Sequence, residues 1–256
     1  MTAAQRTLHS WAPVGFGLTV LAAIGLVLEG LLLAGALNRY IIPLPSEVLG
    51  SFQRIIVEED ILGKLLITCR ECLYAMTLVA TVGILVGALL YRVEVLRQAC
   101  ETWIAAMASA PIVLMYPLFL VIFGRSATTI ITMGFIAGLP PVILTTIEGL
   151  SSTRRVLINV GKSFNLSPWQ TFSKILFPAA MPTIFVGLRL GLIFCLINIV
   201  GVEFLINLGG LGQAINEFAE RYDLGGTYAA ICFVILTSVI FFVATERIER
   251  WLRPQD

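Results

Sequence analysis

The strongest constraint in this 256-residue sequence is a set of six apolar stretches, each long enough to cross a lipid bilayer. A spanning helix needs about 20 mainly apolar residues, because it rises about 1.5 Å per residue through about 30 Å of hydrocarbon. The six stretches are residues 14–37, 73–91, 103–123, 127–150, 181–206 and 227–244. We therefore expect an all-α integral membrane protein with one transmembrane domain over residues 1–256, embedded in a lipid bilayer.

Composition excludes several other classes of protein. The chain is 58% hydrophobic and 13% charged, whereas soluble domains average about 45–50% and about 25%. The net charge of +1 argues against a nucleic-acid partner. The five cysteines lie in or beside apolar runs and the only histidine is His9, so we expect no metal site. No phosphate-binding Gly-x-x-x-x-Gly-Lys-Ser/Thr run is present, so we expect no cofactor on this chain.

The distribution of lysine and arginine predicts the orientation, because cytoplasmic loops are enriched in these residues. Six spans divide the connecting segments into two sets, and both termini belong to one of them. That set carries ten cationic residues: Arg6, Arg92, Arg97, Arg154, Arg155, Lys162, Lys174, Arg247, Arg250 and Arg253. The other set carries six: Arg39, Arg54, Lys64, Arg70, Arg125 and Arg221. We therefore expect both termini in the cytoplasm.

On this orientation, residues 151–180 form the longest polar break on the cytoplasmic side. Its first half, residues 153–164, has apolar residues at helical spacing and predicts a short amphipathic helix. Asn165 suits the left-handed turn that ends a helix. Ser167, Pro168 and Gln170 then provide an N-cap, a first-turn proline and a capping box. We expect a helix-turn-helix hairpin whose second helix ends by Pro178.

The segment Asn159–Pro182, which reads NVGKSFNLSPWQTFSKILFPAAMP, resembles the cytoplasmic loop of ABC-importer permeases. That loop has the pattern Glu-Ala-Ala, a glycine some four residues on, and a later Leu-Pro. The chain is also similar to the nitrate, sulfonate, taurine and bicarbonate branch of this family. This further similarity lies in Ile42–Leu49, Pro111–Gly124, and Glu203 with Gly209–Gly212.

The resemblance implies a permease subunit of an ATP-driven importer in the plasma (inner) membrane of a prokaryote. It implies cytoplasmic ATPase subunits that bind ATP and magnesium, and an extracytoplasmic substrate-binding protein. The substrate that it implies is a small anionic solute. The loop would be the element that couples ATP hydrolysis to alternating access. Its candidate ATPase-coupling residues are Asn159, Lys162, Ser163, Phe164, Asn165, Leu166, Ser167, Pro168 and Trp169.

Two departures from the family pattern bear on the partner subunit. The Glu-Ala-Ala stretch aligns with Asn159-Val160-Gly161, so the acidic residue of the family is absent, and its glycine aligns with Asn165. The resemblance implies two permease subunits around one pathway. We expect a homodimer whose ATPase contact uses other residues; the alternative is a heterodimer whose second permease keeps the full motif.

Three ionisable residues within spans are candidates for the substrate pathway: Glu29, Arg189 and Glu203. A charge at the bilayer centre costs about 2.5–3.5 kcal/mol on insertion scales, so it faces a partner or water. Arg189 could instead reach the interface or pair with a neighbour. Arg70 and Glu71 precede the second expected span, and we expect them to make interfacial contacts. Gly83 and Gly87 are expected to pack within the chain.

The extracytoplasmic segments Asn38–Gly63 and Asn207–Gly226 are candidates for the landing surface of a binding protein, with ordinary solvated loops as the equal alternative. For the whole chain, a self-contained ion-coupled transporter or channel is the competing hypothesis. It would need midplane carboxylates or two repeated halves, and we find no convincing repeat. A membrane enzyme is disfavoured by the lack of a His/Asp/Glu or Ser/Lys constellation.

Overall fold

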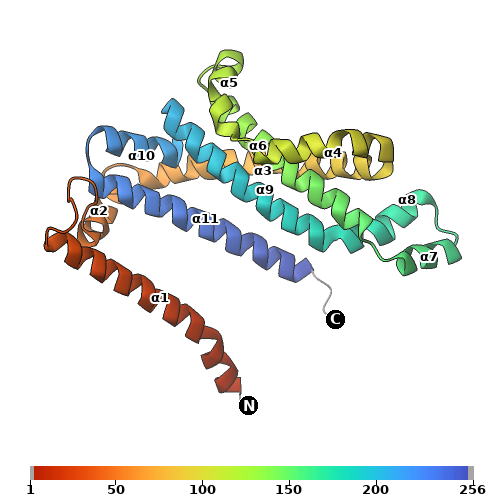
Figure 1. Ribbon diagram of the computed structural model, residues 1–256, viewed down its shortest axis with the longest axis horizontal. Coiled ribbons are helices and arrows are strands. Elements are labelled where there is room, and N and C mark those ends of the chain that lie inside the picture. Colours follow the sequence, from red (N-terminus) through yellow and green to blue (C-terminus); the bar gives the residue numbers. More distant parts are fainter. Residues whose placement is uncertain (1–2, 253–256) are drawn as a thin grey trace.

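A computed structural model describes residues 3–252, so Arg253, counted above for orientation, lies outside the described residues. The described part is a bundle of helices without strands (Figure 1). The helices are α1 (Ala3–Leu33), α2 (Pro45–Val57), α3 (Ile61–Arg92), α4 (Glu94–Ser109), η1 (Ile112–Met115), α5 (Tyr116–Phe123), α6 (Ala127–Ser151), α7 (Arg155–Ser163), α8 (Pro168–Thr171), η2 (Phe172–Leu176), α9 (Phe177–Ile206), α10 (Gly210–Glu220) and α11 (Leu224–Leu252).

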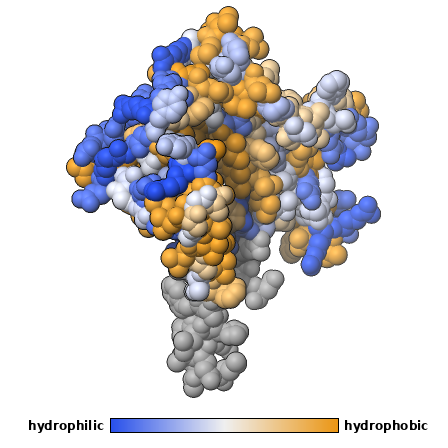
Figure 2. Space-filling model, turned by 60° about the vertical axis from the view of Figure 1, so that its left-hand side comes forward, coloured by the Kyte–Doolittle hydropathy of each residue, from blue (hydrophilic) through white to orange (hydrophobic). Residues whose placement is uncertain are grey.

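Length and hydropathy support a membrane-spanning bundle. Among the described residues, five helical segments are long and apolar enough to cross a bilayer, and a bent pair provides a sixth candidate. Figure 2 shows the consequence at the surface: broad apolar areas are continuous, and the hydrophilic residues gather in separate patches. Such an apolar exterior is stable when lipid, or another apolar surface, covers it.

The centre of the bundle is the packing of α3, α6 and α9, and glycines bring these helices close together. A Cβ atom added to Gly138 would lie 2.8 Å from the carbonyl oxygen of Gly191, and one added to Gly191 would lie 2.9 Å from that of Gly138. Gly83 and Gly87 of α3 face Val142 and Thr146 of α6 in the same way. The expectation that these two glycines pack within the chain is confirmed.

The third apolar stretch, expected as one helix over residues 103–123, is a broken pair. Helix α4 and the η1–α5 segment are bent by 89° relative to each other. The bend lies at Ala110, which is extended (φ −76°, ψ 136°). Pro111 explains it, because proline lacks an amide donor and its ring disfavours helical geometry in the preceding residue. The prediction of one continuous helix is wrong here.

Helix α3 starts earlier than the second expected span. Asp60 caps it by accepting a hydrogen bond from the backbone N–H of Gly63 at 3.2 Å, and the helix begins at Ile61 rather than near Leu73. Arg70 and Glu71 consequently lie inside the helix. Glu71 is only 2% exposed, so the prediction of an interfacial contact is wrong for this residue.

The second hairpin helix does not end by Pro178, as the sequence had suggested. Helix α8 continues through the π-helical segment η2 into α9, and the whole run from Pro168 to Ile206 is helical. The backbone N–H of Phe177 donates to the carbonyl of Phe172, five residues back. This wider turn continues the helix up to Pro178, which stands in the first turn of α9, where a missing N–H is tolerated.

The elements of functional interest lie at opposite ends of the bundle. Helices α7 and α8 project at one end, which we call the hairpin end, and α2 and α10 lie at the other, the α10 end (Figure 1). Helix α1 stands away from the rest of the bundle and approaches it only near α2 (Figure 1). In the apolar part of α1, 6% of the residues are buried.

Candidate functional site

The turn of the α7–α8 hairpin is built by local hydrogen bonds. Asn165 adopts the left-handed conformation at φ +51°. The backbone N–H of Leu166 donates to the carbonyl of Gly161 at 3.0 Å, and that of Asn165 donates to Lys162 at 2.9 Å. This pair of bonds is the Schellman motif, which satisfies the last carbonyls of a helix. The predicted left-handed turn at Asn165 is confirmed.

The capping box predicted for the second helix is also present. The Ser167 hydroxyl accepts from the backbone N–H of Gln170 at 3.2 Å, and the Gln170 side chain accepts from the backbone N–H of Ser167 at 2.9 Å. Pro168 occupies the first turn. All of these contacts lie within Gly161–Gln170, so the conformation of the turn follows from ten residues of sequence.

The hairpin exposes large apolar side chains. Phe164 is 75% exposed, Trp169 73% and Val156 70%. Trp169 stacks on Phe172, with 5.8 Å between ring centroids, so its ring is fixed and still accessible. Of the nine residues predicted to contact an ATPase, Leu166 is half-buried and the others are exposed: Asn159, Lys162, Ser163, Phe164, Asn165, Ser167, Pro168 and Trp169. The structure therefore gathers all nine on one projecting unit.

Gly161 is a structural residue of the hairpin that sequence reasoning did not single out. It is the only buried residue of α7, and a Cβ atom there would lie 2.7 Å from the Ile175 side chain. The missing side chain lets α7 pack closely on η2. Since η2 runs into α9, the exposed hairpin is joined to the centre of the bundle without an intervening loop.

At the α10 end, the carboxylate of Glu203 holds three helices together. Glu203 of α9 is completely buried. It accepts from the Thr68 hydroxyl of α3 at 2.8 Å and from the backbone N–H of Gly212 in α10 at 2.8 Å. The Thr68 hydroxyl in turn accepts from the backbone N–H of Leu211 at 2.9 Å. A carboxylate at a helix N-terminus is favoured by free N–H groups and by the helix dipole.

Sequence reasoning missed Thr68 and Glu71, which lie on α3 near Glu203. The two residues are three apart, so they lie on neighbouring parts of one helix face. Because both residues precede the second expected span, residues 73–91, nothing in the sequence indicated that they are buried. Only the approach of α9 and α10 places both beside a buried carboxylate.

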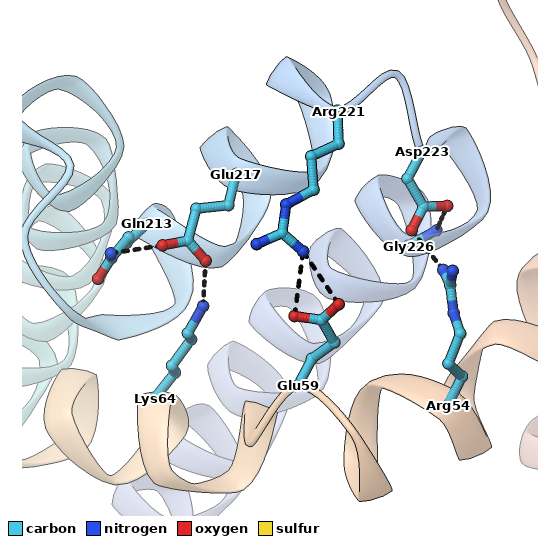
Figure 3. A network of polar contacts seen from close by, with 8 residues as sticks. All are labelled: Arg54, Glu59, Lys64, Gln213, Glu217, Arg221, Asp223 and Gly226. Atoms are coloured by element: carbon cyan, nitrogen blue, oxygen red, sulfur yellow. Dashed lines mark hydrogen bonds and ion pairs between the residues drawn. The ribbon is translucent and has the colours of Figure 1, made fainter.

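The same end is reinforced by ion pairs between the α2–α3 region and α10 or the start of α11 (Figure 3). Arg54 pairs with Asp223, and Lys64 pairs with Glu217. Arg221 donates to both oxygens of Glu59 at 3.0 and 3.3 Å. Two of these pairs, Arg54–Asp223 and Arg221–Glu59, join the two segments that were predicted to receive a binding protein, and Lys64 directly follows the first segment.

The three predicted pathway residues do not form one site. Arg189 pairs with Glu249 of α11, and its guanidinium lies 5.2 Å from the centre of the Phe242 ring. Glu203 lies 14 residues further along α9, which is about 21 Å of helix. Glu29 is half-buried on α1. Arg189 therefore pairs with a neighbour, which was one of the two alternatives to a pathway role, and Glu203 binds the chain's own backbone.

Comparison with known families gives a match over most of the chain. Residues 80–254 match the model of the family described as "Binding-protein-dependent transport system inner membrane component". A probable ABC transporter permease protein of Brucella melitensis is 25% identical over 242 residues, which cover 93% of this chain and 98% of the relative. The riboflavin transport system permease protein RibX of Chloroflexus aurantiacus is 26% identical, covering 94% and 90%.

Further relatives and solved structures agree with this match. The putative aliphatic sulfonates transport permease protein SsuC of Bacillus subtilis is 24% identical over 91% of this chain and 81% of its own length. An inward-facing structure of the MetNI methionine ABC transporter has a chain that superposes with a TM-score of 0.67 at 18% identity. The superposition covers 76% of this chain and 96% of that one. At this level of sequence identity, the structural similarity shows the fold alone.

Proposed function

This chain belongs to the family of binding-protein-dependent transport system inner membrane components, and on that premise we propose that its α7–α8 hairpin docks on an ATPase subunit. The chain is the permease subunit of an ATP-driven importer, and ATP hydrolysis belongs to a separate subunit. A permease of this kind works with an ATPase and with a substrate-binding protein. The self-contained ion-coupled transporter is thereby disfavoured.

The observation that carries the docking proposal is the exposed, rigid apolar tip of the hairpin. Phe164 and Trp169 expose about three quarters of their surface to solvent at the end of the bundle. Exposed aromatic side chains held in a fixed conformation are typical anchors of protein interfaces. Because α8 runs through η2 into α9, a displacement of the tip moves the central helix with it. This is the geometry that coupling needs.

We place the hairpin end in the cytoplasm, together with both termini. The support is the excess of lysine and arginine in the segments of that side, ten against six. The ATPase would then bind ATP and magnesium in the cytoplasm, and the α10 end would face the binding protein. The segments joined by the ion pairs in Figure 3 would be its landing surface.

The substrate we propose is a small anion, taken up by a homodimer of this permease. The support is the similarity to a sulfonate permease, SsuC, in which an anionic solute is named. Another relative, RibX, is named for the transport of riboflavin, so the relatives differ in the solutes that their names give. A homodimer is proposed because the hairpin is complete in this chain, although the acidic residue of the family motif is replaced by Asn159.

The test is a pull-down of tagged protein from native membranes, with co-purifying chains identified by mass spectrometry and ATP hydrolysis assayed. We expect an ATPase subunit with the wild type and its loss with Phe164→Asp. Tyr40→Asp is the matched control, because Tyr40 is 92% exposed and does not belong to the hairpin. It should retain the ATPase.

Phe164 is a better test position than Leu166, whose half-buried side chain supports the turn itself. A second, different permease among the co-purified chains would replace the homodimer with a heterodimer. If correctly inserted wild-type protein brings down no ATPase, or if Phe164→Asp keeps it, the docking proposal is wrong.

A further inference from the structure

Helix α3 carries a polar stripe on the face that it turns away from the bundle. Arg70, Tyr74, Thr77 and Thr81 follow one another at spacings of four, three and four residues, so they lie on one helix face. All four side chains are exposed. The opposite face is buried and contains Cys72, Ala75, Val79, Gly83 and Leu90.

This stripe is unusual because it lies between two rows of leucines. Leu66 and Leu73 flank it on one side, and Leu78 and Leu85 on the other, and these leucines are 45–70% exposed. Ionisable residues are rare on a helix face turned to lipid. Here the apolar rows lie at the margins, and the polar residues occupy the middle of the exposed face.

Arg70 is the residue that demands an explanation. It makes no ion pair with the residues that the structure describes, in contrast to Arg189, which pairs with Glu249. The neighbouring carboxylate of Glu71 is on the buried side of the helix. An arginine facing hydrocarbon is costly, whereas an arginine facing water that contains anions is not.

The position of Arg70 along α3 fits the mouth of a pathway. With 32 residues, α3 is about 48 Å long, so it exceeds the hydrocarbon core of about 30 Å. Arg70 lies nine residues from the α10 end of the helix, and the stripe continues from it for about 16 Å toward the middle. Each threonine donates its hydroxyl hydrogen to its own helix, at 2.7 and 2.8 Å, which leaves an oxygen acceptor facing outward.

We propose that Arg70, Tyr74, Thr77 and Thr81 line a water-filled pathway between this subunit and a second permease subunit, and that Arg70 binds small anions at its mouth. This inference rests on the proposed importer function and names the pathway wall. A guanidinium among low-dielectric leucine rows concentrates anions locally. The hydroxyls beyond it then provide weak, successive contacts for a solute that must also leave.

The test measures how fast charged thiol reagents reach single cysteines in the assembled transporter. In a background whose five native cysteines are replaced, cysteine is introduced at 74, 77 or 81. Controls are introduced at Leu78 and Leu85, in the leucine row beside the stripe and further from the α10 end than Arg70. The probes are an anionic sulfonatoethyl and a cationic trimethylammonioethyl methanethiosulfonate. We expect reaction at the three stripe positions and little at the two leucine positions.

Charge selectivity tests the role of Arg70. In the Thr77→Cys protein, the anionic probe should react faster than the cationic probe. Arg70→Gln should lower the ratio of the anionic to the cationic rate about tenfold. Arg92→Gln is the matched control, since it removes the same charge from the other end of α3. It should leave the ratio unchanged.

The outcomes separate this inference from the proposed function. If the ATPase co-purifies and hydrolyses ATP but the stripe positions react no faster than Leu78→Cys and Leu85→Cys, the stripe is not a pathway wall. If the positions react but Arg70→Gln leaves the ratio unchanged, the anion-binding role is wrong. If the cysteine-free background is inactive, Thr77→Cys is introduced into the wild-type protein instead. The labelling of the five native cysteines is subtracted, and the ratio of the anionic to the cationic rate is measured for the remaining reaction.

Discussion

The two ends of the bundle differ in how far apart in the sequence their contacts reach and in how much apolar surface they expose. At the α10 end, polar contacts join distant parts of the chain: Glu203 binds Thr68 and the N-terminus of α10, and three ion pairs join the α2–α3 region to α10 and the start of α11 (Figure 3). At the hairpin end, polar groups are satisfied by local caps, but large apolar side chains stay exposed. The difference teaches that long-range polar contacts hold the α10 end together, whereas the hairpin end keeps the exposed apolar surface that the proposed ATPase contact requires.

The largest effect should follow from removing the buried carboxylate. Glu203→Ala leaves the Thr68 hydroxyl and the Gly212 N–H without their acceptor in a buried site, at about 1–3 kcal/mol for each group. We expect a marked fall in thermal stability of the purified protein in detergent. Glu203→Gln keeps the shape and one acceptor oxygen and should lose less. Equal stability of wild type and the alanine variant would mean that α10 is held by other contacts.

A smaller loss is expected from crowding the same junction. In Gly212→Ala, the new Cβ would lie 2.2 Å from the backbone carbonyl oxygen of Val200, and backbone atoms cannot move aside cheaply. Overpacking of this kind costs about 1–3 kcal/mol. Gly50→Ala is the control, because nothing lies within 4 Å of its new Cβ and it is within helix α2. It should be neutral or stabilising in the same thermal assay, and a similar loss in both would remove the steric explanation.

Changing the hairpin turn should affect coupling more than stability. Asn165→Val places a β-branched residue at φ +51°, where a side chain of this type costs about 1–2 kcal/mol. Since the turn makes only local contacts, we expect nearly unchanged thermal stability but reduced substrate-stimulated ATP hydrolysis by the assembled transporter. Asn165→Gly should retain that activity. Loss of global stability in the valine variant would contradict the expectation that the turn at Asn165 contributes little to the stability of the bundle.

The smallest effect is expected from the most exposed of the three ion pairs in Figure 3. Arg221 and Glu59 have side chains 57% and 28% exposed, and surface pairs contribute about 0–1 kcal/mol. Arg221→Ala should therefore lower stability slightly, and the difference should shrink as salt is added. Lys64→Ala should cost more, because the pair with Glu217 is less exposed. A salt-independent loss at Arg221 would point to packing rather than charge.

The hairpin shows how far local sequence reaches. The left-handed Asn165, the N-cap Ser167 and the reciprocal Gln170 contact were all readable from spacing, because each bond joins residues within five positions. The membrane class was readable for a similar reason, since a long apolar run has few other stable environments. The bend at Pro111 was encoded locally too, but the apolar run around it favoured a continuous helix.

The α10 end shows what only the tertiary structure decided. Nothing near Glu71 or Thr68 in the sequence signals that α9 and α10 cover them, because the contacts join residues about 135–143 positions apart. Likewise, the stripe from Arg70 to Thr81 becomes meaningful only once the opposite face of α3 is known to be buried. Sequence alone determined the all-helical class, the membrane character and the turn of the hairpin, since these depend on period, length and capping. Which charges are buried, paired or open to a pathway depends on how distant helices pack, and periodicity within one helix carries no record of that.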